Sequence, residues 1–156
     1  MIIRNAEGRD IPRILELLSQ VLEIHADIRP DIFVGGTTKY TAEELADILA
    51  DENRRTFVAV DDSGYVLGYA FCVIQDFTNT NNIVPHREIY VDDLCVDKNA
   101  RGQHIGKVLF EHVLQQAKAL GCYEVTLNVW NGNDSAQAFY TKMGMKPKET
   151  TMEIII

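Results

Sequence analysis

The chain has 156 residues, a net charge of −8 and a sequence pI of about 4.9. Its 46% hydrophobic and 24% charged residues are ordinary for a globular protein, and the length suits one domain over residues 1–156. The acidic balance is the opposite of a nucleic-acid-binding surface. No apolar run reaches the ~18 residues of a membrane span, and the N-terminus does not resemble a signal sequence. We therefore expect a cytoplasmic protein without nucleic-acid or membrane partners.

The first third of the chain predicts one strand and two helices. Met1–Arg4 reads as a short strand. Asp10 is placed to cap a helix whose apolar residues recur every three or four positions as far as Leu22. The stretch Thr41–Glu44 has the pattern of a capping box, and the helix behind it should run to about Asp51.

The rest of the chain alternates between strands and helices. Phe57–Val60 and Tyr65–Ile74 flank the turn-forming segment Asp61–Gly64, which predicts an antiparallel hairpin. The remaining predicted elements are a strand over Glu88–Val96, a helix from Ile105 ended by Gly121, a strand over Glu124–Trp130, a helix capped near Asn133 or Asp134 and ended by Gly144, and a strand over Met152–Ile156. This order predicts an α+β fold with a mixed, mainly antiparallel, twisted sheet flanked by about four helices.

The loop between the strand ending at Val96 and the following helix is suited to an anion. Gly102 and Gly106 allow the main chain to approach a ligand closely, and the unpaired amides that open the helix attract negative charge. Arg101 and Lys107 add positive charge, so we expect the ligand to be a phosphate. The loop lacks both Gly-x-Gly-x-x-Gly and Gly-x-x-x-x-Gly-Lys-Ser/Thr, which argues against the common nucleotide loops. A kinase would also need magnesium-binding carboxylates nearby, where Asp97 stands alone.

Two motifs resemble those of the GNAT N-acetyltransferase superfamily. The first resembles its pyrophosphate loop, Arg/Gln-x-x-Gly-x-Gly/Ala, over Arg101, Gly102, Gln103, His104, Ile105 and Gly106, with Lys107 behind it. His104 stands where the first glycine is usual, and we expect it to keep a helical or bridge backbone conformation. The second motif, Leu127–Met145, has an Asn-bearing turn followed by Ala-x-x-Phe-Tyr, with Gly-Met in place of the usual Gly-Phe. The resemblance covers nearly the whole chain and implies the GNAT acyl-CoA N-acyltransferase fold.

The resemblance implies an acetyl-CoA-dependent N-acetyltransferase that acts on a primary amine of a small molecule or protein, by direct attack within a ternary complex. The alternative is a non-catalytic acyl-CoA-binding sensor. In the family, the main chain at positions matching Leu94, Cys95 and Val96 pairs with the pantetheine arm and offers an amide to the oxyanion. The loop from 101 to 107 would hold the pyrophosphate. Further cofactor contacts are implied for Asn128, Asn133 and Ser135, although as single residues the last two are more often helix caps.

The implied general acid is Tyr140, since a phenol, which ordinarily titrates near pH ~10, stays protonated at neutral pH and can donate to a departing thiolate. From the residues alone, it could instead be a core tyrosine beside Phe139. The base is expected to be a carboxylate of the strand before the loop, which offers Glu88, Asp92 and Asp93. Glu88 and Asp92 share one face of a regular strand, and Asp93 lies on the other unless a bulge turns it.

The amine acceptor is expected to contact the loops His25–Tyr40 and Phe77–Arg87, which line the acceptor side in the family. His25 and His86 are further candidates for a base or a substrate contact, or are surface histidines. No group of His, Cys or carboxylate residues has metal-ligand spacing, so we predict no metal. The apolar end Ile154–Ile156 would suit strand pairing across a homodimer.

Overall fold

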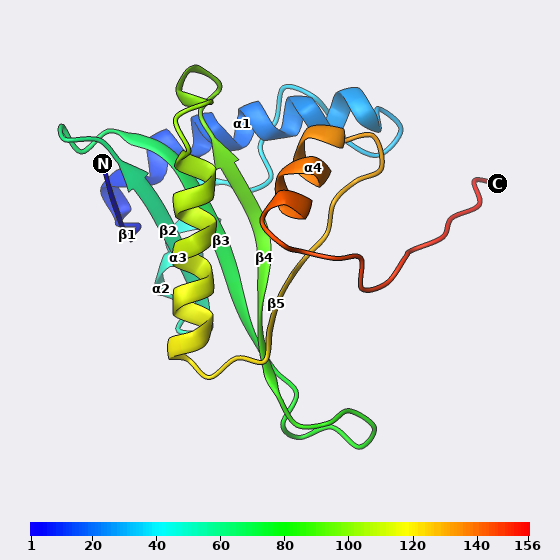
Figure 1. The fold of residues 1–156 in the computed structure, drawn as a ribbon. Coiled ribbons are helices and arrows are strands. Elements are labelled where there is room, and N and C mark those ends of the chain that lie inside the picture. The colour runs from blue at the N-terminus through cyan, green and yellow to red at the C-terminus, as the bar shows by residue number, and fades with distance from the viewer.

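The computed structural model describes all 156 residues and has an open five-stranded sheet with helices on both faces (Figure 1). The strand order is β1-β2-β3-β4-β5; neighbours are antiparallel except β4 and β5, which are parallel. This confirms the α+β class and the mixed, mainly antiparallel sheet. The elements are β1 (Ile2–Asn5), α1 (Ile11–Ile28), α2 (Ala42–Ala50), β2 (Arg54–Val60), β3 (Val66–Asp76), β4 (Arg87–Val96), α3 (Ile105–Ala119), β5 (Glu124–Leu127) and α4 (Asp134–Lys142).

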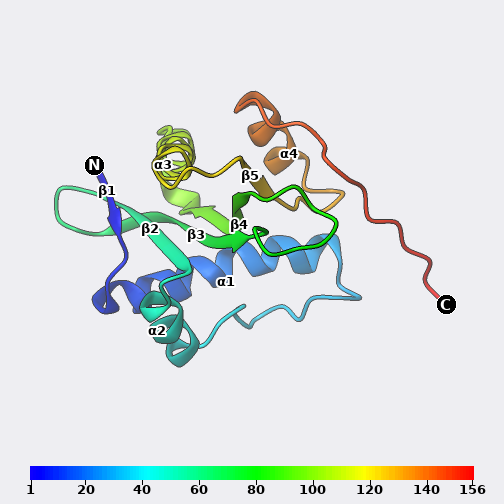
Figure 2. The same cartoon turned by 90° about the horizontal axis from the view of Figure 1, so that it is seen from below.

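Each face of the sheet carries its own apolar core. On one face, side chains of α1 and α2 such as Leu17 and Leu45 pack against Tyr69 and Phe71 of β3. On the other, α3 packs against the alternate residues of β2, β3 and β4, with Leu109 at its centre. The two-residue period of the strands explains this division, because successive side chains point to opposite faces. Figure 2 shows α1 and α3 on either side of the sheet, with α4 beside α3.

The structure confirms one predicted helix cap and contradicts another. Thr41 caps α2, and its reciprocal bond with Glu44 completes the expected capping box. The prediction for Asp10 was wrong, because its carboxylate makes no cap bond to α1. A short 3₁₀ turn places Asp10 in a helical conformation, where it accepts hydrogen bonds from the Arg4 guanidinium at 2.6 and 2.9 Å and from the Glu7 amide at 2.8 Å. It ties β1 to the start of α1.

The C-terminal part of the sheet is smaller than predicted. β5 ends at Leu127 instead of Trp130, and Met152–Ile156 forms no strand. The side chains of Ile154 and Ile155 are 89% and 76% exposed. A strand needs a neighbour for its amides and carbonyls, and this segment has none in its own chain. Its pairing in a homodimer stays a prediction.

The end of β4 is held by a contact from the opposite end of the chain. The guanidinium of Arg13 in α1 donates to the buried carboxylate of Asp97, which directly follows β4. The same carboxylate accepts the amide of Asn99 at 3.0 Å, which fixes a 3₁₀ turn over Lys98–Ala100. This anchor sets the position of the glycine-bearing loop.

None of the helices combines the length and apolar character needed to cross a membrane.

Candidate active site

The loop Arg101–Lys107 has the geometry of an anion cradle. Gly102 has a φ of 81°, where an L side chain would be strained, and α3 begins three residues later. The first helical bond inside α3 runs from the Val108 amide to the His104 carbonyl at 3.1 Å. The amides of residues 101–107 therefore donate to no acceptor within the protein. A row of free amides at a helix N-terminus fits a pyrophosphate group.

His104 departs from the expected conformation. It has φ 61° and ψ 13°, and it is the only residue other than glycine with a positive φ. The expectation of a helical or bridge conformation was therefore wrong: the position keeps the left-handed backbone that glycine adopts easily. Histidine is among the residue types enriched in this region, so the loop keeps its shape at a modest cost in strain.

The fourth and fifth strands pair over only half of β4. The β4–β5 ladder runs from Glu88 opposite Glu124 to Val91 opposite Leu127. Beyond Val91, β4 pairs with β3 alone, while the chain after β5 leads away to α4 (Figure 1). The expected cofactor segment, Leu94, Cys95 and Val96, lies in this half of β4, so its outer main-chain edge has no strand beside it. An extended ligand can add to that edge as a strand would.

A β-bulge sets the direction of the two aspartates. Phe71 of β3 pairs with Asp93 and the next residue, Cys72, pairs with Val91, so Asp92 is the extra residue on β4. Because of this bulge, Asp93 lies on the α1 face with Phe71, which is also the face of Glu88. The sequence predicted this orientation only if a bulge occurs in β4, and the bulge is present.

The surroundings of the two aspartates differ. Asp92 accepts from Lys39 Nζ at 2.9 Å and from the Tyr40 hydroxyl at 2.7 Å. Asp93 accepts from the Tyr69 hydroxyl at 2.8 Å and forms no ion pair. Burial raises the pKa of the Asp93 carboxyl to about 6. A carboxyl with this pKa can take up a proton near pH 6.

Tyr140 lies in α4, which packs against α3. Its ring makes edge contacts with Phe110 at 5.7 Å and Phe139 at 5.0 Å between centroids. Its hydroxyl has no hydrogen-bond partner in the protein, which distinguishes it from Tyr40 and Tyr69. Burial, and then the nearby negative charge of Asp93, raise the pKa of the Tyr140 phenol. A half-buried phenol with a free hydroxyl near a carboxylate can serve as a proton donor.

Glu88 lies at the far end of β4 from Asp93. It is 6% exposed and accepts from the Thr126 hydroxyl at 3.1 Å. Glu88 and Asp92 were both predicted as catalytic carboxylates, but the structure separates them along β4.

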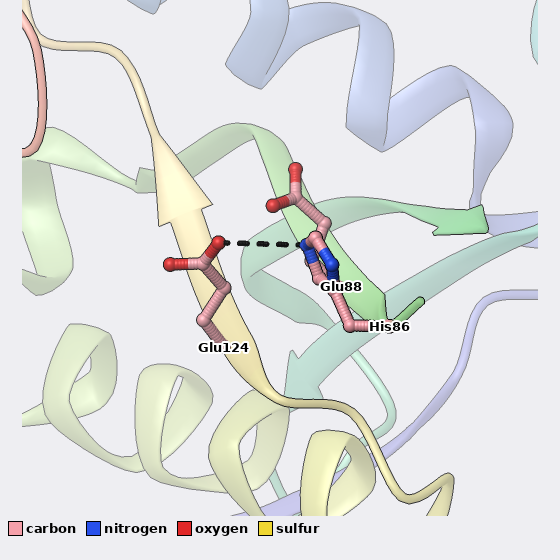
Figure 3. A group of neighbouring side chains, drawn as sticks. All are labelled: His86, Glu88 and Glu124. Carbon is pink, nitrogen blue, oxygen red and sulfur yellow. Dashed lines mark ion pairs between the residues drawn. The ribbon is translucent and has the colours of Figure 1, made fainter. Parts of the chain in front are cut away.

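Three ionisable side chains gather at this far end of β4. Figure 3 shows Glu88 beside Glu124 of β5 and His86, whose Nε2 is 3.9 Å from Glu124 Oε1. Their possible ligand atoms all lie within 4.8 Å of one another, a proximity that spacing along the sequence did not indicate. The hydrogen bond from the Lys148 ammonium, at 2.7 Å, holds the pKa of Glu124 below its usual range.

The three expected polar cofactor contacts have partners of their own. Asn133 caps α4 by accepting from the Ala136 amide at 3.3 Å, and the Ser135 hydroxyl donates to the same Asn133 oxygen at 3.2 Å. The capping interpretation of Asn133 is therefore confirmed. Asn128 donates to the Tyr90 hydroxyl at 3.2 Å. Their contacts to a cofactor stay predictions.

The two expected acceptor loops lie toward opposite ends of β4, with Lys39 and Tyr40 of the first near its end and Phe77–Arg87 just before its start (Figure 1). His25 lies 5.2 Å from Phe33, and Phe33 lies 5.3 Å from Trp130. These contacts join the end of α1 and its following loop to the chain after β5. His86 stacks on Phe77 at 5.1 Å in the second loop.

Sequence reasoning missed several residues of this region: Lys39, Tyr40, Tyr69 and Lys148. Each is placed by a contact with a β4 or β5 carboxylate that is 24 to 53 residues away in the chain. Such contacts leave no local pattern.

A split mixed sheet, an amide cradle behind the fourth strand and a free phenol near the split define a class of enzyme that transfers an acyl group from a phosphate-bearing thioester. Comparison with known proteins identifies the family. Residues 18–145 match the family described as Acetyltransferase (GNAT) family. The chain therefore belongs to the GNAT family and is an N-acetyltransferase. Enzymes of this family use acetyl-CoA as the acyl donor.

Individual relatives agree with this assignment. The chain is 28% identical to "Glucosamine 6-phosphate N-acetyltransferase" of Trypanosoma brucei brucei over 158 residues, covering 97% of this chain and 93% of that one. A stretch of 57 residues, 36% of each chain, is 46% identical to "Peptidyl-lysine N-acetyltransferase YjaB" of Salmonella typhimurium. The crystal structure of a mutant BH1408 protein from Bacillus halodurans superposes with a TM-score of 0.95 at 30% identity, over 100% of this chain and 99% of that one.

Proposed function

We propose that the chain transfers the acetyl group of acetyl-CoA directly to a primary amine, in a ternary complex formed where β4 and β5 separate. One observation carries this proposal: the Tyr140 hydroxyl has no hydrogen-bond partner in the protein, and the half-buried Asp93 carboxylate is near enough for its negative charge to raise the Tyr140 pKa. One group can give a proton and the other can take one, as aminolysis of a thioester requires.

The donor would be held by main-chain groups. The free amides of Arg101–Lys107 suit the pyrophosphate, with the Arg101 and Lys107 side chains adding charge. The unpaired edge of Leu94–Val96 suits the pantetheine arm, and one of its amides would stabilise charge that develops on the acetyl oxygen. Acetyl-CoA supplies the acyl group and the thiol leaving group. Asn128 and Ser135 would complete the groove.

The two side chains account for both proton transfers of the reaction. The amine nitrogen bonds to the acetyl carbon, the carbon–sulfur bond breaks, the amine loses a proton and the sulfur gains one. Asp93 takes the proton from the amine, directly or through water, and Tyr140 gives its proton to the sulfur. Asp93 becomes neutral when it accepts the proton, and this removes one of the causes that raise the Tyr140 pKa. Proton uptake at one residue therefore helps release at the other.

Asp92 and Glu88 have supporting places in this scheme. Asp92 is held by Lys39 and Tyr40, so it positions the acceptor loop against β4. Glu88 lies roughly 13 to 17 Å from Asp93 at ~3.3 Å per strand residue, counting four steps on β3 or five on β4, too far to share its proton. The acceptor is a primary amine; the amino sugar and the peptidyl-lysine in the names of the two relatives are both of this kind.

The experiment is thiol release from acetyl-CoA with a panel of amines: amino sugars, lysine peptides and linear polyamines. We expect Tyr140→Phe to lower kcat at least 100-fold with the best acceptor while acetyl-CoA binding is retained. Tyr123→Phe is the matched control, because Tyr123 is 80% exposed and remote from Tyr140 in the fold. Retained turnover in Tyr140→Phe would eliminate Tyr140 as the acid. Acetyl-CoA binding without transfer to any amine would favour the sensor alternative.

A further inference from the structure

A polar strip follows one face of β4 and β5. Where β4 and β5 pair, the residues that face α3 are apolar, whereas those on the α1 face are polar or charged. We define the polar strip as Glu88, Tyr90 and Asp92 of β4, Glu124 and Thr126 of β5, and Asn128 just after β5. Two hydrogen bonds link its two sides, from Thr126 to Glu88 and from Asn128 to Tyr90. The strip ends beside Asp93, the proposed base.

The far end of the strip is an anionic cluster of Glu88, Glu124 and His86 (Figure 3). Glu88 and Glu124 are directly opposite in the β4–β5 ladder, where like charges repel unless a cation lies between them. Glu88 is more than nine-tenths buried; its Oε1 accepts from the Thr126 hydroxyl, and its Oε2 has an ion-pair partner, the Lys148 ammonium, but no hydrogen bond. A cation at this position would satisfy both carboxylates.

The cluster already holds an ammonium group. Lys148 Nζ lies 2.7 Å from Glu124 Oε1 and 3.7 Å from Glu88 Oε2. Its side chain is 58% exposed and comes from the C-terminal segment, which has no helix or strand. Chemically, Lys148 stands in for the end of an alkylammonium ion.

The near end of the strip repeats this arrangement. Lys39 Nζ lies 2.9 Å from Asp92 Oδ1, and Lys39 comes from the loop between α1 and α2. Asp92 and Glu88 lie about 13 Å apart along β4, at roughly 3.3 Å per residue. The strip thus binds two ammonium groups, one at each end, both supplied by irregular segments of the chain.

We propose that the cluster of Glu88, Glu124 and His86 is a subsite for the distal ammonium of a linear polyamine acceptor, and that Lys148 occupies it when no acceptor is bound. This inference rests on the proposed transfer at Asp93 and Tyr140. The reacting amine lies at Asp93, roughly 13 to 17 Å from Glu88 along the strand at ~3.3 Å per residue. A lysine side chain is too short to reach both ends, whereas an extended tetraamine such as spermine has the required length.

Replacing the Lys148 ammonium by the distal ammonium of a polyamine should cost little free energy. A partly exposed ion pair from a segment without regular structure contributes little to stability, so Lys148 can leave without disturbing the sheet. The incoming ammonium then takes the place of Lys148 beside Glu124 and Glu88. The net charge of −8 attracts a polycation to the protein as a whole.

The test compares acetylation of spermine with that of propylamine, which has the same reacting end and no distal charge. We expect Glu124→Gln to raise KM for spermine about 10-fold and to leave propylamine unchanged. Lys148→Gln should lower KM for spermine several-fold, because it removes the internal competitor. Lys146→Gln, which changes a neighbouring lysine without an ion pair, should alter neither substrate. The opposite effects of the first two variants cannot come from a general loss of folding.

The outcomes separate this inference from the proposed function. Equal kcat/KM for spermine and propylamine, an equal effect of Glu124→Gln on both, or a preference for a dilysine peptide or amino sugar over spermine would overturn the polyamine subsite alone. Absence of transfer to any amine would overturn the proposed function. In that case, calorimetric titration with spermine decides on the subsite: binding weakened by Glu124→Gln supports it, and binding unaffected by the change refutes it.

Discussion

Replacing Asp93 with asparagine should make the protein more stable and nearly inactive. The carboxyl has a pKa raised to about 6 by burial, whereas an aspartate in an unfolded chain has a pKa near ~3.9. The folded state therefore binds this proton more tightly. The stabilisation of the folded state that comes from binding this proton is fully present below about pH 4, and it is lost as the pH rises through about 6.

The magnitude follows from the shift. A rise of about two pKa units corresponds to about 3 kcal/mol at ~1.36 kcal/mol per unit, and this is the largest cost that the ionised carboxylate imposes above pH 7. The asparagine side chain would keep an oxygen to accept the Tyr69 hydroxyl, which lies 2.8 Å from the present carboxylate. We expect Asp93→Asn to gain about 1 to 3 kcal/mol at pH 8.

Urea denaturation at several pH values measures this gain. The difference between Asp93→Asn and the parent protein should be largest at pH 8 and should shrink as the pH falls from 6 toward 4. Asp92→Asn is the matched control, because it removes a carboxylate whose charge is already paired with Lys39 and should gain nothing. A gain that is absent at pH 8, or that stays constant from pH 8 to pH 5, would refute the buried-charge reasoning. Acetyl transfer by Asp93→Asn should fall at least 100-fold, as expected for loss of a general base.

Three further outcomes are expected. The kcat/KM of the parent protein should decrease as the pH falls below about 6, because Asp93 must be ionised to accept a proton. A pH profile of kcat/KM with one acceptor measures this decrease. The same decrease at low pH in Asp93→Asn would contradict the role of Asp93. Gly68→Ala should cost about 2 kcal/mol in urea denaturation, since the new Cβ would lie 2.6 Å from the Cys95 carbonyl oxygen, whereas Gly8→Ala meets nothing within 4 Å and should be nearly neutral. His104→Gly should raise the thermal midpoint, because it relieves roughly 1 kcal/mol of left-handed strain; a lower midpoint would argue against strain at this position.

Several features of this protein follow from sequence alone. The strands and helices of the first 145 residues are predicted by apolar periodicity, glycine stops and caps such as Thr41 and Asn133, because these signals act within a few residues. The phosphate loop at Arg101–Lys107 is likewise a local motif. Tyr140 is identified as a candidate acid by the residues around it. What these patterns share is short range along the chain.

The proposed choice of Asp93 among the carboxylates rests on the tertiary structure alone. Whether Asp93 faces the site depends on a bulge, and the bulge depends on how β4 pairs with a strand that lies more than twenty residues away. Lys39 and Lys148 reach their carboxylates through charge attraction across the fold, which has no periodic signature in the sequence. The apolar C-terminal end at Ile154–Ile156 shows that a local pattern can also predict an element that does not form. Its composition predicts a strand, but a strand forms only where the fold supplies a neighbouring edge.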